Sequence, residues 1–300
     1  MTEAVVGGPT TEMVDPPRRA PRISKSWWGL APFILYAFAL LLLPAAAVLV
    51  RAFRGPDGGL TLQNFRDMGD RQYVVAFRTS ITLSVLSAVV GVVFGGFLAY
   101  SALALRRPKW LRGALMTFSG LGAQFGGVPL AFIFISTLGV TGMVTKLLNN
   151  VGFHLYPDFK IYSFTGLVIV YAYFQIPLMV IVIAPAIEGL REQWREAAAN
   201  LGASDWQFWR HVGLPVLTPS ILGAFVLLFA NAFSAYATAY ALTSGSVGLV
   251  PVKIGSFLRG NVSADNAQLG QALATGMLVI VVVAMALYLW LQKRAARWAK

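Results

Sequence analysis

Six long stretches of this chain contain no Asp, Glu, Lys or Arg, and this feature constrains the fold more than any other. A helix needs about 20 consecutive apolar residues to cross the hydrocarbon core of a bilayer. Each of the six stretches is longer than that, and only 12% of all residues are charged, whereas a soluble domain has roughly 25%. We therefore predict an all-α integral membrane protein with six transmembrane helices. The stretches are 26–50, 79–105, 113–145, 161–187, 212–252 and 266–292.

The stretch 212–252 is too long for one straight helix across a bilayer. Residues that typically end a helix cluster near its C-terminal end, namely Thr243, Ser244, Gly245, Gly248 and Pro251. We predict one transmembrane helix that stops at these residues and is followed by an outer loop.

The distribution of Lys and Arg predicts the orientation, because short cytoplasmic loops of membrane proteins retain positive charge. If both termini are cytoplasmic, fifteen of the 24 Lys and Arg residues fall in inner segments. We therefore predict that both termini lie in the cytoplasm. The net charge of +12 has the same explanation, since short basic clusters beside apolar stretches fix topology and contact anionic lipid headgroups. We expect no nucleic-acid partner.

The first 25 residues differ in composition from the rest, being rich in Pro, Gly, Thr and charge. Such a segment cannot bury enough apolar surface to fold, so we predict a disordered cytoplasmic tail over 1–25 and a transmembrane domain over 26–300. The chain contains no cysteine, which excludes disulfides and thiolate metal sites.

Few residues are suited to enzymatic chemistry. The two histidines, His154 and His211, fall in loops on opposite sides, and no acidic residue lies within the six stretches. A proton-driven carrier or an intramembrane hydrolase normally needs an ionisable group facing its cavity. No Gly precedes a Lys, so the phosphate-binding loop G-x-x-x-x-G-K-[ST] is absent. We expect no enzyme activity, metal or cofactor in this chain, and energy for active transport would come from a partner.

The longest inner loop, 188–212, has the composition of two short helices joined at a bend. The run 196–201 favours a helix, and Gly202 is a natural helix stop. Ser204 and Gln207 have the spacing of a capping box for a second helix. Trp206 and Trp209 would share one face of that helix.

The spacing within this loop resembles a known family signature. The chain reads Glu196-Ala197-Ala198, three residues, Gly202, nine residues, and then Val212-Gly213-Leu214-Pro215. This pattern resembles the EAA motif, E-A-A-x3-G-x9-I-x-L-P, of permease subunits of binding-protein-dependent ABC importers. The chain departs from the motif only in having Val212 where the motif has Ile.

The resemblance implies a multi-pass protein of the bacterial inner membrane whose loop 188–215 couples it to ABC ATPase subunits. Glu196 would pair with a basic group of the ATPase, Ala197 and Ala198 would allow close approach, and Gly202 would set the bend. The implied partners are two ATPase subunits that bind ATP and Mg²⁺, a second homologous permease and an extracytoplasmic substrate-binding protein. The segment 230–245 is similar to permeases for polyamines or organophosphonates.

Other functions remain open at this stage. A six-helix channel or facilitator would leave the ordered inner loop without a role, and a structural membrane subunit of an enzyme complex is a second alternative. An ABC importer permease for another solute, such as a sugar, has the same motif. Acidic residues that would attract a polyamine are missing from the apolar stretches, whereas Arg78 at the outer end of the second stretch could attract an anion.

Polar residues in the fifth stretch predict the translocation pathway. Asn231, Ser234 and Thr238 recur at intervals of three and four, which places them on one stripe of a continuous helix. Because polar groups exposed to lipid are costly, we expect this stripe to face a water-filled cavity rather than a partner helix. Tyr236 and Tyr240 lie on another face and could reach the substrate.

Gln124 is a further candidate pathway residue in the third stretch. Gly120, Gly122, Gly126, Gly127 and Pro129 surround it. Such a composition either lets neighbouring helices pack closely or interrupts the helix beside a cavity, and we favour close packing.

Overall fold

The computed structural model describes residues 26–55, 58–104, 109–258 and 267–298. The predicted disordered tail, 1–25, lies outside this range. The described residues form helices and one isolated bridge between Arg54 and Leu60, which confirms the all-α prediction.

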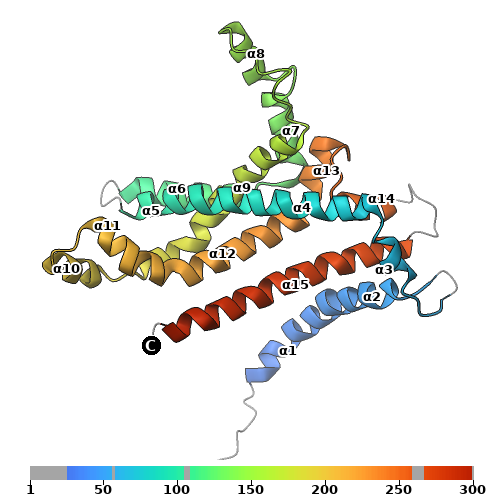
Figure 1. Ribbon diagram of the computed structural model, residues 1–300, viewed down its shortest axis with the longest axis horizontal. Helices are drawn as coiled ribbons and strands as arrows, with labels where there is room; N and C mark the ends of the chain where they lie inside the picture. Colours follow the sequence, from blue (N-terminus) through green and yellow to red (C-terminus); the bar gives the residue numbers. More distant parts are fainter. Residues whose placement is uncertain (1–25, 56–57, 105–108, 259–266, 299–300) are drawn as a thin grey trace, which may run out of the picture. The chain divides into compact units, whose positions relative to one another are not determined.

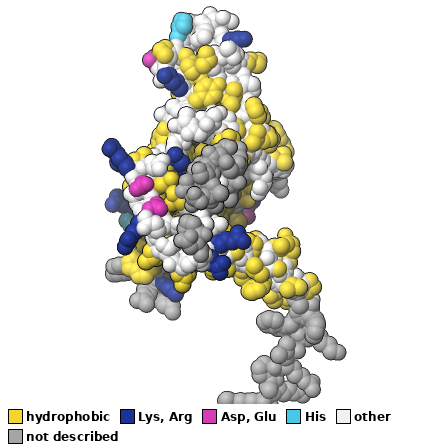
Figure 2. Space-filling view, turned by 90° about the vertical axis from the view of Figure 1, so that its right-hand side faces the viewer, with side chains coloured by type: hydrophobic (Ala, Val, Ile, Leu, Met, Phe, Trp, Pro, Cys, Tyr) yellow, Lys and Arg dark blue, Asp and Glu magenta, His cyan; other side chains and the backbone are white. Residues whose placement is uncertain are grey.

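Six helical segments of the described chain are long and apolar enough to cross a membrane, which confirms the predicted number. Large hydrophobic side chains cover much of the visible surface, as expected of a surface that contacts lipid (Figure 2). The six segments are Pro32–Ala52, Arg71–Leu103, Gly127–Asn150, Phe164–Glu188, Asp205–Ser234 and Gln268–Lys293.

The chain divides into two compact units at Ala47. The first contains α1 (Ser26–Ala37), the π-helix η1 (Phe38–Leu42) and the start of α2 (Leu43–Ala52). The second holds all the remaining elements. They are α3 (Gln63–Asp67), α4 (Arg71–Val90), η2 (Gly91–Gly95), α5 (Gly96–Ala104), α6 (Lys109–Gln124), α7 (Gly127–Leu138), α8 (Met143–Asn150), α9 (Phe164–Glu188), α10 (Glu192–Asn200), α11 (Asp205–Phe208), η3 (Trp209–Gly213), α12 (Leu214–Ser234), α13 (Ala237–Thr243), α14 (Val250–Leu258) and α15 (Ala267–Trp298).

Helix α9 is the centre of the second unit and the most buried of the six apolar segments. It packs against α4, η2, α5, α6 and α12, while α15 runs along α12 and α14 (Figure 1). Small residues allow the closest approaches. A Cβ atom added at Gly91 would lie 2.6 Å from Leu228 Cδ2, and one added at Gly95 would lie 2.5 Å from the Ile176 carbonyl oxygen. These glycines therefore let the η2 backbone contact its neighbours directly.

The third apolar stretch, 113–145, is not one helix, and the close packing predicted for its glycines is found at Gly122. Helix α6 ends at Gln124, and α7 begins at Gly127, which has a φ of +75° that favours glycine. A Cβ atom at Gly120 or Gly126 would have no neighbour within 4 Å, so close packing is confined to Gly122, which contacts Pro177. Helix α6 packs along α9, whereas α7 and α8 turn away from the bundle (Figure 1).

The fifth apolar stretch is also interrupted, at a place that the sequence did not predict. Helix α12 ends at Ser234, and a separate short helix, α13, follows. The predicted stop at Thr243 is correct, because Ser244 and Gly245 both have positive φ and end α13 there. The reason for the earlier break lies in tertiary contacts described below.

Candidate functional site

The inner loop folds into two short helices joined at a bend, as predicted. Helix α10 ends in a Schellman motif, in which the Ala203 N–H donates to the Ala198 carbonyl and the Gly202 N–H donates to the Ala199 carbonyl. Gly202 has a φ of +79°, a left-handed conformation that is costly for residues with a Cβ. Gly202 therefore sets the bend through its backbone.

The second helix begins with the predicted capping box. The Ser204 hydroxyl accepts from the Gln207 N–H, and the Gln207 side chain accepts from the Ser204 N–H at 2.7 Å. From this cap α11 continues through η3 into α12 without a break, which the sequence did not predict. The fifth membrane span is therefore a direct extension of the loop.

The residues that the EAA resemblance singles out are accessible. Glu196 and Ala197 are exposed, Ala198 is half-buried, and none of the residues of α10 is buried. Leu214 and Pro215 are exposed at the start of α12. Two large apolar side chains near the bend are also exposed, Leu201 at 88% and Trp206 at 68%. A role in ATPase coupling stays a prediction for Glu196, Ala197, Ala198, Gly202, Leu214 and Pro215.

Trp209 connects the loop to the second membrane span. Its ring meets that of Tyr100 of α5 edge-on, with 4.8 Å between the ring centres. A Cβ atom at Gly213 would lie 2.6 Å from Trp209 Cε3, so the indole packs directly on the Gly213 backbone. Gly213 occupies the x position of the I-x-L-P part of the motif, where the pattern does not specify a residue. In this chain the glycine leaves room for the Trp209 ring to pack on its backbone.

Two ion pairs lie close to α10. Arg112, near the start of α6, pairs with Glu188 at the end of α9. Arg195 of α10 donates from Nη2 and Nε to Asp205 Oδ1, at 2.9 and 3.2 Å. The first pair joins α6 to the end of the fourth membrane span, and the second crosses the bend. Neither pair was predicted from the sequence.

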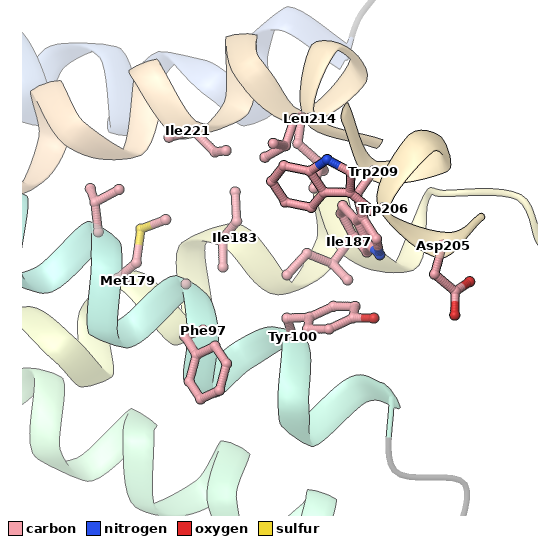
Figure 3. A pocket seen from close by; sticks show the side chains of 13 residues that line it. Phe97, Tyr100, Met179, Ile183, Ile187, Asp205, Trp206, Trp209, Leu214 and Ile221 are labelled. Atoms are coloured by element: carbon pink, nitrogen blue, oxygen red, sulfur yellow. The ribbon is translucent and has the colours of Figure 1, made fainter. Parts of the chain in front are cut away.

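An apolar groove lies beside this loop, between α5, α9 and the run from α11 to α12. Its volume is about 560 Å³. The rings of Tyr100, Trp206 and Trp209 lie at one end and Met179 at the other, while the Asp205 carboxylate points away (Figure 3). A polar cavity of about 360 Å³ adjoins the groove and shares Tyr100 and Trp209 with it.

The predicted pathway residues do not form one stripe. Asn231 and Ser234 are exposed on α12, but Thr238 belongs to α13 and is 3% exposed. The Thr238 hydroxyl accepts a hydrogen bond of 2.8 Å from the Gly127 N–H, the first residue of α7. The predicted single stripe was wrong because it assumed a continuous helix through 231–238, whereas a role of these residues in the translocation pathway stays a prediction.

The side chains of Thr238 and Tyr171 stabilise the two helix interruptions. Thr238 satisfies the backbone at the start of α7, and the hydroxyl of the buried Tyr171 donates at 2.9 Å to the carbonyl of Ala235, where α12 ends. Backbone groups freed by a broken helix must find partners when no water is available. The breaks therefore depend on hydrogen bonds between distant parts of the chain.

The remaining predicted residues have varied surroundings. Tyr236 and Tyr240 stack with 5.6 Å between ring centres and 20° between planes. Gln124 is exposed at the end of α6.

Gln175 was missed, although a lone Gln within the apolar stretch 161–187 was a usable signal. It is fully buried, donates from Nε2 to the Leu228 carbonyl at 2.8 Å, and accepts from Asn231 Nδ2 at 3.5 Å.

Comparison with known protein families gives one match over most of the chain. The model described as "Binding-protein-dependent transport system inner membrane component" matches residues 91–297. This range contains the inner loop, both helix breaks and every predicted coupling and pathway residue.

Several curated relatives are similar to the chain. The sulfate transport system permease protein CysW of Synechococcus elongatus is 27% identical over 71% of each chain. The thiamine transport system permease protein ThiP of Salmonella typhimurium is 28% identical over 76% of this chain and 40% of its own length. The putative ferric transport system permease protein FbpB 1 of Haemophilus influenzae is 24% identical over 89% of this chain and 42% of its own length.

Solved structures share the fold. A chain of a bacterial ABC transporter that imports the acidic polysaccharide alginate superposes with a TM-score of 0.70, at 20% identity over 92% of this chain and 96% of that one. A chain of the MetNI methionine ABC transporter gives a TM-score of 0.56, at 15% identity over 74% of this chain and 95% of that one.

Proposed function

Because the chain belongs to the family of binding-protein-dependent transport system inner membrane components, we propose that it forms half of a translocation pathway that α10 couples to a separate ATPase. The chain is a multi-pass permease of the bacterial inner membrane. Beyond the family assignment, we propose which helix docks on the ATPase, which partners the chain has and which class of solute it transports.

The observation that best supports the coupling role is the combination of order and exposure in α10. A Schellman motif and a capping box fix the bend that follows this helix, yet none of the residues of α10 is buried. A short helix has little stability of its own in water, so a solitary ordered one is suited to docking on another protein. Ala197 and Ala198 leave one face thin enough to enter a cleft.

Coupling would proceed by rigid-body motion. ATP and Mg²⁺ would bind to two ATPase subunits, whose closure would move α10 of this chain and the corresponding helix of a second permease. Because α11, η3 and α12 are continuous, a displacement of α10 would reach the fifth span directly. An extracytoplasmic binding protein would deliver the solute to the opposite side.

Co-purification tests the docking role. We expect a tagged wild-type chain, expressed with the other subunits of its transport system, to retain the ATPase. Glu196→Ala should retain less ATPase, because it removes the carboxylate predicted to pair with a basic group there. Asp158→Ala, a loss of the same charge in a loop far from α10, should retain as much as wild type. Equal retention by all three proteins would contradict the docking role.

Labelling of single introduced cysteines tests the orientation. The chain has no native cysteine, so each label reports one position. Cysteines at positions 109 and 205 should react only from the cytoplasmic side, and a cysteine at position 158 only from outside. The reverse pattern would place α10 on the wrong side for an ATPase.

For the solute we propose a small anion. The relatives are named for sulfate, ferric iron and thiamine, so they do not support the polyamine or organophosphonate subgroup in particular. Helices α4 to α7, α12, α13 and α15 contain no acidic residue, whereas a polyamine would prefer carboxylates. Arg78 is exposed on α4 and could attract an anion. Organophosphonates belong to this class and polyamines do not.

Thermal unfolding of the cognate binding protein tests the solute class. A bound ligand raises the apparent stability of the protein that binds it. We expect sulfate or methylphosphonate to raise the midpoint and spermidine to leave it unchanged. Stabilisation by spermidine alone would refute the anion proposal without affecting the docking role of α10.

A further inference from the structure

The apolar groove and the polar cavity beside the coupling loop form one amphipathic site. They share Tyr100, Ile187 and Trp209, so the cavity adjoins the groove at its aromatic end. The groove has the volume of a typical small-molecule site, and its lining is almost entirely apolar. A ligand that fills both parts must have an apolar segment joined to a polar one.

Arginines determine the charge that the polar cavity prefers. Arg112, Arg191 and Arg195 line it, together with the acidic residues Glu188 and Glu192. Arg112 pairs with Glu188, and Arg195 pairs with Asp205.

Arg191 is the arginine that remains for a ligand. It makes no ion pair within the described chain, and its guanidinium lies 5.9 Å from the centre of the Trp194 ring. An exposed guanidinium offers planar, paired N–H donors that match a phosphate group. The lining holds three arginines against two acidic residues, Glu188 and Glu192, a formal excess of one positive charge, so the polar cavity favours an anionic group.

The aromatic residues indicate the depth of this junction in the membrane. Trp and Tyr are enriched where hydrocarbon meets the headgroup layer, because their rings are apolar and their N–H or O–H groups are polar. Tyr100, Trp206 and Trp209 lie together at the end of the groove beside the cavity (Figure 3). The groove thus points into the hydrocarbon and the cavity lies at headgroup level.

We propose that the groove and the cavity together bind one anionic phospholipid. An acyl chain lies in the groove against α5, α9 and α12, and the phosphate accepts hydrogen bonds from Arg191. Basic pockets between transmembrane helices on the cytoplasmic side are a known type of site for anionic headgroups. The lipid contacts Trp209 and Tyr100, the pair that joins the coupling loop to the second span. The proposal does not depend on the transported solute.

Lipid retention by the purified full-length chain tests the proposal. The chain is reconstituted in nanodiscs of phosphatidylcholine with or without phosphatidylglycerol, extracted in detergent, and assayed for bound lipid by mass spectrometry. We expect wild type to retain phosphatidylglycerol in preference to phosphatidylcholine. Arg191→Gln should retain about tenfold less phosphatidylglycerol, as expected for the loss of hydrogen bonds to a charged group. Arg210→Gln removes an exposed arginine of the same loop that lines neither cavity, and should behave as wild type.

A second pair of variants tests the groove. A Cβ atom at Gly96 would make only an ordinary contact, 3.7 Å from Met179 Cε, so Gly96→Leu fills the groove without a backbone clash. Gly96→Leu should lower the retention of phosphatidylglycerol, whereas Gly113→Leu, at an open position of α6, should leave it unchanged. Equal retention of the two lipids, or equal losses in Arg191→Gln and Arg210→Gln, would overturn the proposal. So would cross-linking of Phe97→Cys, at an exposed position of the groove, to a second permease, because the groove would then be a subunit interface.

Discussion

The chain bends sharply in two regions that are stabilised by different means. At the bend between α10 and α11, the Schellman motif and the capping box both form among residues 198–207. At the breaks that precede α7 and α13, the key hydrogen bonds join Thr238 to Gly127 and Tyr171 to Ala235, which lie 111 and 64 residues apart. The bend in the loop is determined by residues that are close together in sequence. The two helix breaks depend instead on hydrogen bonds between distant parts of the folded bundle.

This difference leads to different expectations for mutation. In the coupling loop, a change should alter the geometry of a surface helix and leave the bundle folded. At the helix breaks, a change should destabilise the packing of several helices at once. The following predictions test this contrast, beginning with the largest functional effect.

Gly202→Asp should abolish uptake while leaving membrane insertion intact. A Cβ atom at Gly202 would meet nothing within 4 Å, so the cost comes from the positive φ, about 1–3 kcal/mol for a residue with a Cβ, and from the new negative charge at the bend. Relief of this strain requires α10 to turn away from its present direction. Uptake and ATPase co-purification measure the effect.

Asparagine provides the control for the charge at this position, because Asn and Asp both adopt the left-handed conformation more readily than other residues and differ in charge. Gly202→Asn should therefore retain most of the uptake. Wild-type uptake by Gly202→Asp would show that the bend is not part of the coupling element.

Gly213→Ala should impair both stability and uptake, since Gly213 is where the coupling loop depends on packing rather than on caps. The new methyl group would lie 2.6 Å from the Trp209 ring and displace it from Tyr100. Such overpacking costs about 1–3 kcal/mol. Thermal unfolding in detergent and uptake in vesicles provide the two measurements.

Gly113→Ala is the matched control, because a Cβ atom at this helical position would have no neighbour within 4 Å. It should be as stable as wild type. An unchanged Gly213→Ala protein would mean that Trp209 adjusts freely and does not link the loop to the second span.

Thr238→Val should lower the free energy of unfolding by about 1–3 kcal/mol, because it leaves the Gly127 N–H without an acceptor. Thr238→Ser keeps the hydroxyl and should be close to wild type. Thr243→Val is the control, since the Thr243 hydroxyl is also buried but donates only to the Ala239 carbonyl of its own helix. If Thr238→Val and Thr243→Val lowered the free energy of unfolding equally, the hydrogen bond from the Gly127 N–H to the Thr238 hydroxyl would contribute nothing.

The sequence predicted the parts of the structure that local chemistry determines. Six charge-free stretches gave the number of membrane-spanning segments, and Gly202 and Ser204 gave the bend in the inner loop. Periodicity failed at Thr238, because hydrophobicity does not reveal that Ala235 and Gly127 have partners on other helices.

Packing around glycine was the other limit of prediction. Gly91 and Gly127 look alike in sequence, but one admits a neighbouring side chain and the other has a positive φ. The groove beside Trp209 could not be predicted either, since its walls come from three separate segments of the chain.

The smallest effect should come from the ion pair across the bend. The Arg195 and Asp205 side chains are 54% and 75% exposed, and exposed pairs contribute only about 0–1 kcal/mol because water and salt screen them. Arg195→Gln should therefore change the unfolding midpoint little in low salt and not at all in high salt. Ser204→Ala removes a cap worth about 0.5–2 kcal/mol, and should cost more in either condition. Because Arg195→Gln leaves Asp205 at the start of α11, it separates the ion pair from the favourable position of a carboxylate at a helix N-terminus. If Arg195→Gln proved more destabilising than Ser204→Ala, the bend would depend on electrostatics across its two helices, and the contrast between a locally specified loop and tertiary helix breaks would no longer hold.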